Sequence, residues 1–229
     1  GELPSEIGED EKVTELPTDN LSASIDWRAK GAVNNAQDQG HCGSCWAFSS
    51  TASMEGEHFI KTGKLLKLSE QQFVDCDTGS NGCNGGHTTG AFKYVETNPQ
   101  ELSKDYPYTA KDGSCKASKS KEIVRASGYT WVSPKSDKQL KAAIAKQPTS
   151  VSVNSSTDFH HYTSGILNDK NCGSSTNHAI VAVGYGADSK GQEYYLVRNS
   201  WGASWGEKGY IRVAAGMDGV GICGILTKP

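Results

Sequence analysis

The chain has 229 residues, of which 35% are hydrophobic and 21% are charged, and these values are typical of a globular protein with a buried core. No run of residues approaches the roughly 18 consecutive apolar positions of a membrane-spanning helix, so no membrane span is expected. The net charge is −3 at pH 7, and no basic stretch with interleaved aromatic residues occurs, which argues against nucleic-acid binding.

The first 20 residues differ from the rest of the chain in charge. They carry seven acidic side chains against one lysine, contain Pro4 and Pro17, and lack aromatic residues. Such a composition favours a flexible acidic leader. The start Gly1-Glu-Leu-Pro lacks methionine and the pattern of a signal peptide, so we expect a processed product.

Helices are expected mainly in the first half of the chain. Apolar residues interspersed with small ones predict a long helix over residues 44–60. Residues 69–72 have the spacing of a capping box and predict a short helix. A further helix is predicted over 88–95, before Pro99.

The second half is richer in predicted strands. Residues 136–144 predict one helix, and four Gly-punctuated, β-rich runs follow, at 151–153, 178–183, 194–197 and 209–213. Helices that are segregated from strands favour an α+β fold with two subdomains. We expect residues 21–130 to form a mainly helical subdomain and residues 131–229 a mainly β subdomain, with a cleft between them.

Three separated segments carry residues suited to nucleophilic catalysis. Cys45 lies in Cys-Gly-Ser-Cys-Trp-Ala-Phe, His178 in Asn-His-Ala, and Asn199 in Asn-Ser-Trp-Gly. A thiol nucleophile needs a base that holds it as a thiolate and a third group that orients the base. At the start of a helix, the backbone amides and the helix dipole also favour the thiolate. The odd count of seven cysteines leaves one free thiol if the other six pair.

With these segments in this order, residues 25–224 resemble the papain-like cysteine peptidases of the papain and cathepsin L type. The resemblance implies a two-subdomain α+β fold, in which a helical half and a β-barrel-like half flank the active-site cleft. It also implies that Cys45 is the nucleophile, His178 its base and Asn199 the group that orients the imidazole. Trp201 would cover the His–Asn hydrogen bond, and Gln39 would stabilise the oxyanion. Residues 1–20 would then be the remnant of a propeptide.

The other six cysteines indicate both the disulfide pairing and the cellular location of the protein. The resemblance selects three disulfides, Cys42–Cys83, Cys76–Cys115 and Cys172–Cys223. The high number of cysteines and the glycosylation sequons at Asn20 and Asn154 favour a protein that follows the secretory route. We therefore expect it in the lysosome or vacuole, or outside the cell. The spacing of Cys and His residues does not match a zinc site, and no metal or other cofactor is expected.

Substrate binding is assigned by the same resemblance. Gly85 and Gly86 would form the wall along which a substrate backbone binds, because glycine permits a close approach. The expected lining of the adjacent specificity pocket is His87, Thr88, Ser152, Thr176, Asn177 and Lys228. His87 and a basic floor depart from the family pattern, so we expect a pocket that is more polar than usual and that tolerates a hydrophilic or acidic side chain.

The resulting interpretation is a cysteine endopeptidase that cleaves peptide bonds through a Cys45–His178 ion pair and a thioester acyl-enzyme. It implies a monomeric zymogen product with protein or peptide substrates, inhibited by its own propeptide and by cystatin-like proteins. The chain offers little room between Cys83 and Cys115 for a loop that blocks the cleft as in exopeptidases.

Two alternatives remain. Cys42-Gly-Ser-Cys45 also fits a thioredoxin-like redox motif, which would require a βαβ context. The other is a catalytically silent papain-like binding protein, although such a protein would usually have lost the cysteine or the histidine.

Overall fold

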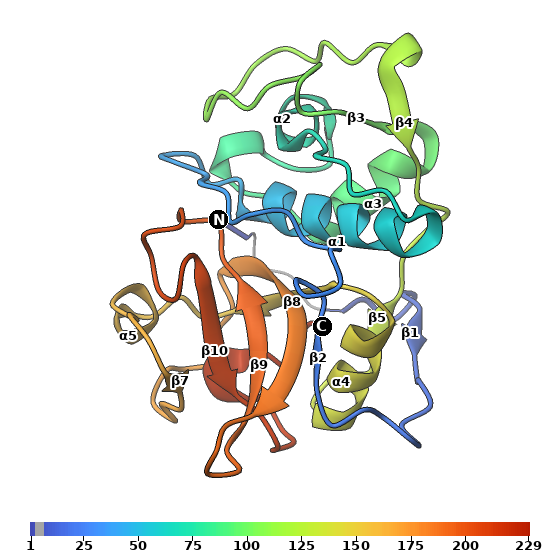
Figure 1. Cartoon of the computed structure of the whole chain (residues 1–229). Coiled ribbons are helices and arrows are strands. Elements are labelled where there is room, and N and C mark those ends of the chain that lie inside the picture. Colours follow the sequence, from blue (N-terminus) through green and yellow to red (C-terminus); the bar gives the residue numbers. More distant parts are fainter. Residues whose placement is uncertain (3–6) are drawn as a thin grey trace.

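The structure is a computed structural model that describes residues 1–2 and 7–229. It has a mainly helical half and a mainly β half, with the long helix α1 (Cys45–Thr62) between them (Figure 1). The helical half also holds α2 (Glu70–Cys76), α3 (Thr88–Thr97) and the paired strands β3 (Gln100–Glu101) and β4 (Glu122–Val124). The α+β architecture expected from the sequence is therefore present.

The β half is built on a six-stranded sheet. Its strand order is β2-β8-β9-β10-β7, and β6 pairs with β8 as well. The strands are β2 (Ile25–Asp26), β6 (Thr149–Val153), β7 (Ile166–Leu167), β8 (His178–Ala187), β9 (Glu193–Arg198) and β10 (Tyr210–Ala214). Helices α4 (Asp137–Lys146) and α5 (Thr157–His160) and the 3-10 turn Ile222–Gly224 belong to the same half, and two further 3-10 turns are Gly82–Asn84 and Lys119–Lys121.

The predicted helices are confirmed, and two of them begin with a serine cap, of which the one at Ser69 was expected. The side chain of Ser69 accepts a hydrogen bond from the Gln72 amide at the start of α2, and Ser136 does the same for Gln139 in α4. Each cap satisfies an amide that has no intrahelical partner, and such a cap typically contributes about 1 kcal/mol.

Helix α1 joins the two halves. Its first 12 residues are all buried, because one side packs in the helical half and the other against the sheet. Two of its buried serines are hydrogen-bonded across the boundary: Ser49 Oγ donates to the Ile180 carbonyl (2.7 Å) and Ser53 Oγ to the Pro148 carbonyl (2.9 Å). Small polar residues therefore allow close packing without leaving unsatisfied groups.

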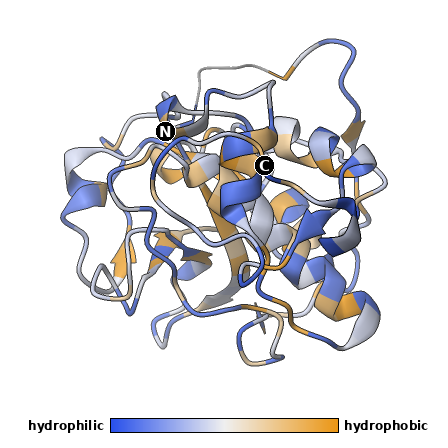
Figure 2. Ribbon diagram, turned by 90° about the horizontal axis from the view of Figure 1, so that it is seen from above, coloured by the Kyte–Doolittle hydropathy of each residue, from blue (hydrophilic) through white to orange (hydrophobic). Residues whose placement is uncertain are grey.

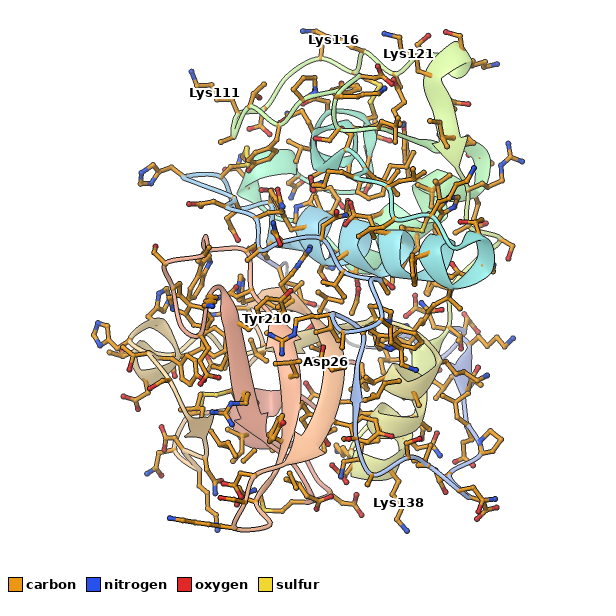
Figure 3. All side chains as sticks on the ribbon, in the orientation of Figure 1. Asp26, Lys111, Lys116, Lys121, Lys138 and Tyr210 are labelled. Carbon is orange, nitrogen blue, oxygen red and sulfur yellow. A yellow bond between two sulfur atoms is a disulfide. The ribbon has the colours of Figure 1, made fainter. Side chains whose placement is uncertain are left out.

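Each half has its own apolar core, and these cores meet at α1. Ala52 of α1 packs into the core of the β half, whereas Ala179 of β8 packs into the core of the helical half. Hydrophobic residues concentrate in the interior and hydrophilic ones along the peripheral loops (Figure 2). Exposed Lys111, Lys116 and Lys121 extend from the outer end of the helical half (Figure 3).

Two features of the N-terminal region differ from expectation. Residues of the acidic leader form strand β1 (Val13–Thr14), which pairs in parallel with β5 (Trp131–Val132). Glu11 contributes to this order, since its carboxylate accepts hydrogen bonds from Tyr129 Oη (2.8 Å) and Trp131 Nε1 (2.6 Å). The expectation of a flexible leader is therefore wrong for this part.

In addition, strand β2 pairs with β8. The start of the segment that was assigned to the helical subdomain therefore lies in the β half.

The three expected disulfides are present. Cys42–Cys83 and Cys76–Cys115 lie in the helical half and Cys172–Cys223 in the β half, and Cys45 is the free cysteine. Each bridge closes a loop of about 40 to 50 residues, and such bridges typically contribute about 2–4 kcal/mol to stability.

Candidate active site

The free thiol lies where the two halves meet. Cys45 is the first residue of α1 and is completely buried. Its Sγ accepts a hydrogen bond from the backbone amide of Ala179 at 3.4 Å. Ala179 follows His178 at the start of β8, so this contact brings the histidine segment to the sulfur although 132 residues separate them in the sequence.

His178 is held by Asn199, which follows strand β9. The distance between His178 Nε2 and Asn199 Oδ1 is 2.7 Å. The same oxygen accepts the backbone N–H of Ser200 at 2.8 Å, which fixes Oδ1 as an acceptor. Nε2 must therefore carry the proton and donate it, and in the neutral ring Nδ1 keeps the lone pair of a base.

Trp201 covers this histidine. Its ring is stacked on the His178 ring with centroids 4.8 Å apart, and also on the ring of His160 with centroids 4.5 Å apart. Phe159 adds an edge contact to both Trp201 and His178. The aromatic layer excludes water from the His–Asn hydrogen bond, which strengthens it in the buried setting.

Gln39 has a fixed orientation beside the thiol. Its Oε1 accepts a hydrogen bond from Ser200 Oγ (2.7 Å), and its Nε2 donates to the Cys42 carbonyl (2.9 Å). One of the two Nε2 hydrogens remains for another acceptor. The Cys45 amide belongs to the first turn of α1 and has no acceptor within the helix. These two donors are suited to an oxyanion.

The charge state of the pair follows from its burial. Burial raises the pKa of the Cys45 thiol. Burial also lowers the pKa of His178 to about 4, against the opposing effect of its hydrogen bond with Asn199. Both shifts favour the neutral thiol–imidazole pair. Greater access of water to the pair would weaken the main cause of both shifts and move the balance toward the ion pair.

Comparison with known proteins agrees with this arrangement. The family model described as papain family cysteine protease matches residues 21–229. The chain belongs to this family.

Three individual proteins are similar to this papain-family chain. Cysteine endopeptidase RepA from Oryza sativa subsp. japonica is 46% identical over 216 residues, covering 92% of the chain and 57% of RepA. Bromelain from Ananas comosus in complex with the E64 inhibitor has a TM-score of 0.88 at 43% identity, covering 91% of this chain and 97% of bromelain. The proform of the ragweed pollen allergen Amb a 11, a cysteine protease, has a TM-score of 0.87 at 38% identity. The match covers 91% of this chain and 65% of the Amb a 11 chain. The chain thus spans less than two thirds of the length of RepA.

The glycine wall lies against α1. A Cβ at Gly86 would lie 2.5 Å from the Trp46 ring, so this position requires glycine. The Gly86 amide donates to the Gly1 carbonyl (3.2 Å), and the Glu2 amide donates to the Asn177 carbonyl (3.0 Å). Residues 1 and 2 therefore lie in the cleft, along the positions predicted to bind a substrate backbone. In Figure 1 the N-terminus lies between the two halves, near the start of α1.

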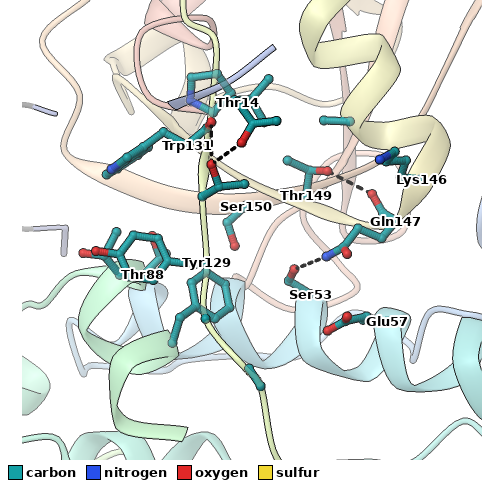
Figure 4. A pocket seen from close by; sticks show the side chains of 18 of the residues that line it. Thr14, Ser53, Glu57, Thr88, Tyr129, Trp131, Lys146, Gln147, Thr149 and Ser150 are labelled. Atoms are coloured by element: carbon teal, nitrogen blue, oxygen red, sulfur yellow. Dashed lines mark hydrogen bonds between the residues drawn. The ribbon is translucent and has the colours of Figure 1, made fainter. Parts of the chain in front are cut away.

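The residues predicted for the specificity pocket fall into two groups. Ser152 is buried and contacts Glu2, whereas His87 and Lys228 are half-buried nearby. Thr88 instead lines a cavity of about 630 Å³ between the two halves, together with Ser150 (Figure 4). Among the described contacts, none joins Thr176, which is half-buried, to Glu2.

Sequence reasoning missed three contributors to the site. The Ala179 amide acts through its backbone, Ser200 positions both Asn199 and Gln39, and His160 stacks on Trp201. Ala179 and Ser200 lay inside motifs already singled out, whereas His160 did not. Within residues 1–2 and 7–229, no helix is long and apolar enough to cross a membrane, and no three metal-binding side chains cluster.

Proposed function

We propose that this chain is a cysteine endopeptidase that hydrolyses peptide bonds in proteins. The observation that carries the proposal is the geometry around Cys45: the Ala179 amide lies on the sulfur, and the adjacent His178 is oriented by Asn199. The named endopeptidase and protease relatives support the same activity.

The reaction follows from these positions. Cys45 passes its proton to His178 Nδ1, and the thiolate attacks the carbonyl carbon of the scissile bond. The second Nε2 hydrogen of Gln39 and the Cys45 amide stabilise the oxyanion. Collapse of the intermediate breaks the C–N bond, and the imidazolium protonates the leaving amine, which leaves a thioester on Cys45. Water, deprotonated by His178, then hydrolyses the thioester and restores the thiol.

The direct test is hydrolysis of a fluorogenic peptide amide with dithiothreitol, before and after one equivalent of a thiol-directed epoxide. We expect activity to disappear as one adduct forms on Cys45, because the other six cysteines are in disulfides. A catalytically silent binding protein would take up the adduct without prior hydrolysis. A redox protein would exchange disulfides without cleaving the peptide.

Replacing Gln39 by alanine is expected to lower kcat roughly 10²–10³-fold with a smaller change in KM, as for the loss of one oxyanion donor. Gln37→Ala is the matched control, because this half-buried side chain bonds only to the nearby Asn35 carbonyl among the described residues. Equal effects of the two variants on kcat would contradict the role of Gln39. Thermal unfolding of both variants measures any loss of the Ser200 contact.

The cellular setting is proposed from the same features. Three disulfides fit an oxidising compartment, so we place the protein in a lysosome or vacuole or outside the cell. We further propose a zymogen origin for the acidic leader, protein or peptide substrates, and inhibition by propeptide-like and cystatin-like proteins. The protein would act as a monomer and without a cofactor.

A further inference from the structure

We propose that the pocket beside Gly86, formed by Ser152 with His87 and Lys228, selects an acidic side chain from peptide substrates. The inference rests on the proposed peptidase function and adds its specificity. It comes from Glu2 of the chain itself, whose side chain occupies this pocket.

Glu2 has the contacts of a bound peptide residue. Its backbone forms a parallel bridge with Gly86 and donates to the Asn177 carbonyl, and the residue is only 8% exposed. Its Oε1 accepts a hydrogen bond from Ser152 Oγ at 2.6 Å. The pocket therefore holds a carboxyl group through a buried hydrogen-bond donor.

Ser152 belongs to the catalytic region. It lies on β6 opposite Ala179 of β8, and Ala179 donates its amide to Cys45 Sγ. The carboxyl-binding position is thus one strand away from the thiol. A side chain held there positions its own peptide backbone within reach of the nucleophile.

Lys228 supplies the matching charge. Burial raises the pKa of Glu2, whereas the Ser152 hydrogen bond and the charge of Lys228 act in the opposite direction. Burial and the charge of Lys228 also lower the pKa of half-buried His87. The Gly1 ammonium also lowers the pKa of Glu2, and Asp77 and Glu11 act on His87 in the direction opposite to Lys228. A cation and a hydroxyl donor thus act on the Glu2 carboxyl group, a combination that suits this group.

The raised pKa of Glu2 gives the preference a pH dependence. The pocket binds the protonated carboxyl group more tightly than the ionised one, so affinity for glutamate increases as pH falls toward the raised pKa. Lys228 matters most for the ionised form. Its removal should therefore weaken glutamate recognition more at pH 7 than at pH 5.

One buried oxygen of Glu2 lacks a hydrogen-bond partner. Among the described residues no donor reaches Oε2, although it is fully buried. Residues lining the cavity of Figure 4 are close neighbours of the pocket residues: Thr88 follows His87, Pro229 follows Lys228, and Ser150 lies two positions before Ser152 on β6.

The first arm of the test compares substrates. Fluorogenic peptides with Glu, Gln, Leu or Phe at the second residue before the scissile bond are offered to the full chain at pH 5 and pH 7. We expect Glu to be cleaved at least as fast as Leu at pH 5, and the Glu:Gln ratio of kcat/KM to rise as pH falls. Lys228→Met should lower the Glu:Leu ratio of kcat/KM about tenfold at pH 7. Lys121→Met, on the outer end of the helical half, is the charge-matched control.

The second arm needs no catalysis. Cys45 is completely buried, and the charges of the N-terminus and of Glu2 act on its thiol. Its alkylation by iodoacetamide therefore reports how firmly Glu2 is held. We expect Glu2→Leu to speed alkylation about tenfold and Glu2→Gln to speed it less. A Leu or Phe preference of tenfold or more over Glu at both pH values, or slower alkylation of Glu2→Leu, overturns the inference. If no peptide is cleaved, the peptidase function fails, and alkylation alone decides the chemistry of the pocket.

Discussion

Replacing Cys45 by alanine will lower kcat/KM for peptide hydrolysis by roughly 10⁴-fold or more, because the covalent route has no second thiol to use. The three disulfides consume every other cysteine. Measurement of fluorogenic peptide hydrolysis, with mass spectrometry after epoxide treatment, checks both the loss of activity and the loss of the adduct.

Ser50→Ala is the matched control for this variant. Ser50 is a small buried residue on the same helix, and among the described residues its Oγ bonds only to the Trp46 carbonyl one turn earlier. We expect this variant to keep its activity, and both variants to retain cooperative thermal unfolding. Full activity in Cys45→Ala would place the nucleophile elsewhere and refute the proposed function.

Local signals were sufficient for much of the fold. The serine caps at Ser69 and Ser136 specify helix starts through atoms three residues apart, and the structure has both. The β-rich runs around 178–183 and 194–197 are likewise strands β8 and β9. Such signals depend on neighbours in the chain, so the sequence carries them directly.

Tertiary contacts account for what the sequence left open. Two contacts join residues that are more than 100 positions apart. They are the parallel pairing of Val13 with Trp131 and the hydrogen bond from Ser152 to Glu2. No periodicity signals such a contact, and the acidic composition of the leader favoured disorder. The Ala179 amide was equally inaccessible, since every residue but proline has one and only the fold directs it at Cys45.

The site residues divide in the same way. Family resemblance identified Cys45, His178, Asn199 and Gln39, which carry distinctive side chains in short motifs. It could not supply their charge state, because burial governs the pKa of both Cys45 and His178. Glu2 connects the two observations, because its backbone pairs with Gly86 and its charge acts on the Cys45 thiol.

His178→Gln is the second variant with a large expected effect. Glutamine cannot accept and return the proton, so kcat/KM should fall roughly 10³-fold or more. His178→Gln is also made in the Cys45→Ala chain, which lacks the nucleophile and therefore does not cleave itself. In that chain the substitution isolates the contribution of the buried imidazole to the free energy of unfolding. His58→Gln, near the C-terminal end of α1, is the control.

The sign of that contribution follows from the pKa of His178, which burial lowers from 6.5 to about 4. Between these values the unfolded chain binds a proton that the folded chain does not, so the free energy of unfolding falls as pH decreases from 6.5 to 4. The imidazole accounts for about 3 kcal/mol of this loss. Urea unfolding across this range should show the loss in Cys45→Ala and in its His58→Gln derivative, and a correspondingly smaller loss in its His178→Gln derivative. Parallel curves for all three would contradict this prediction, because they would mean that folding does not lower the pKa of His178 in these chains.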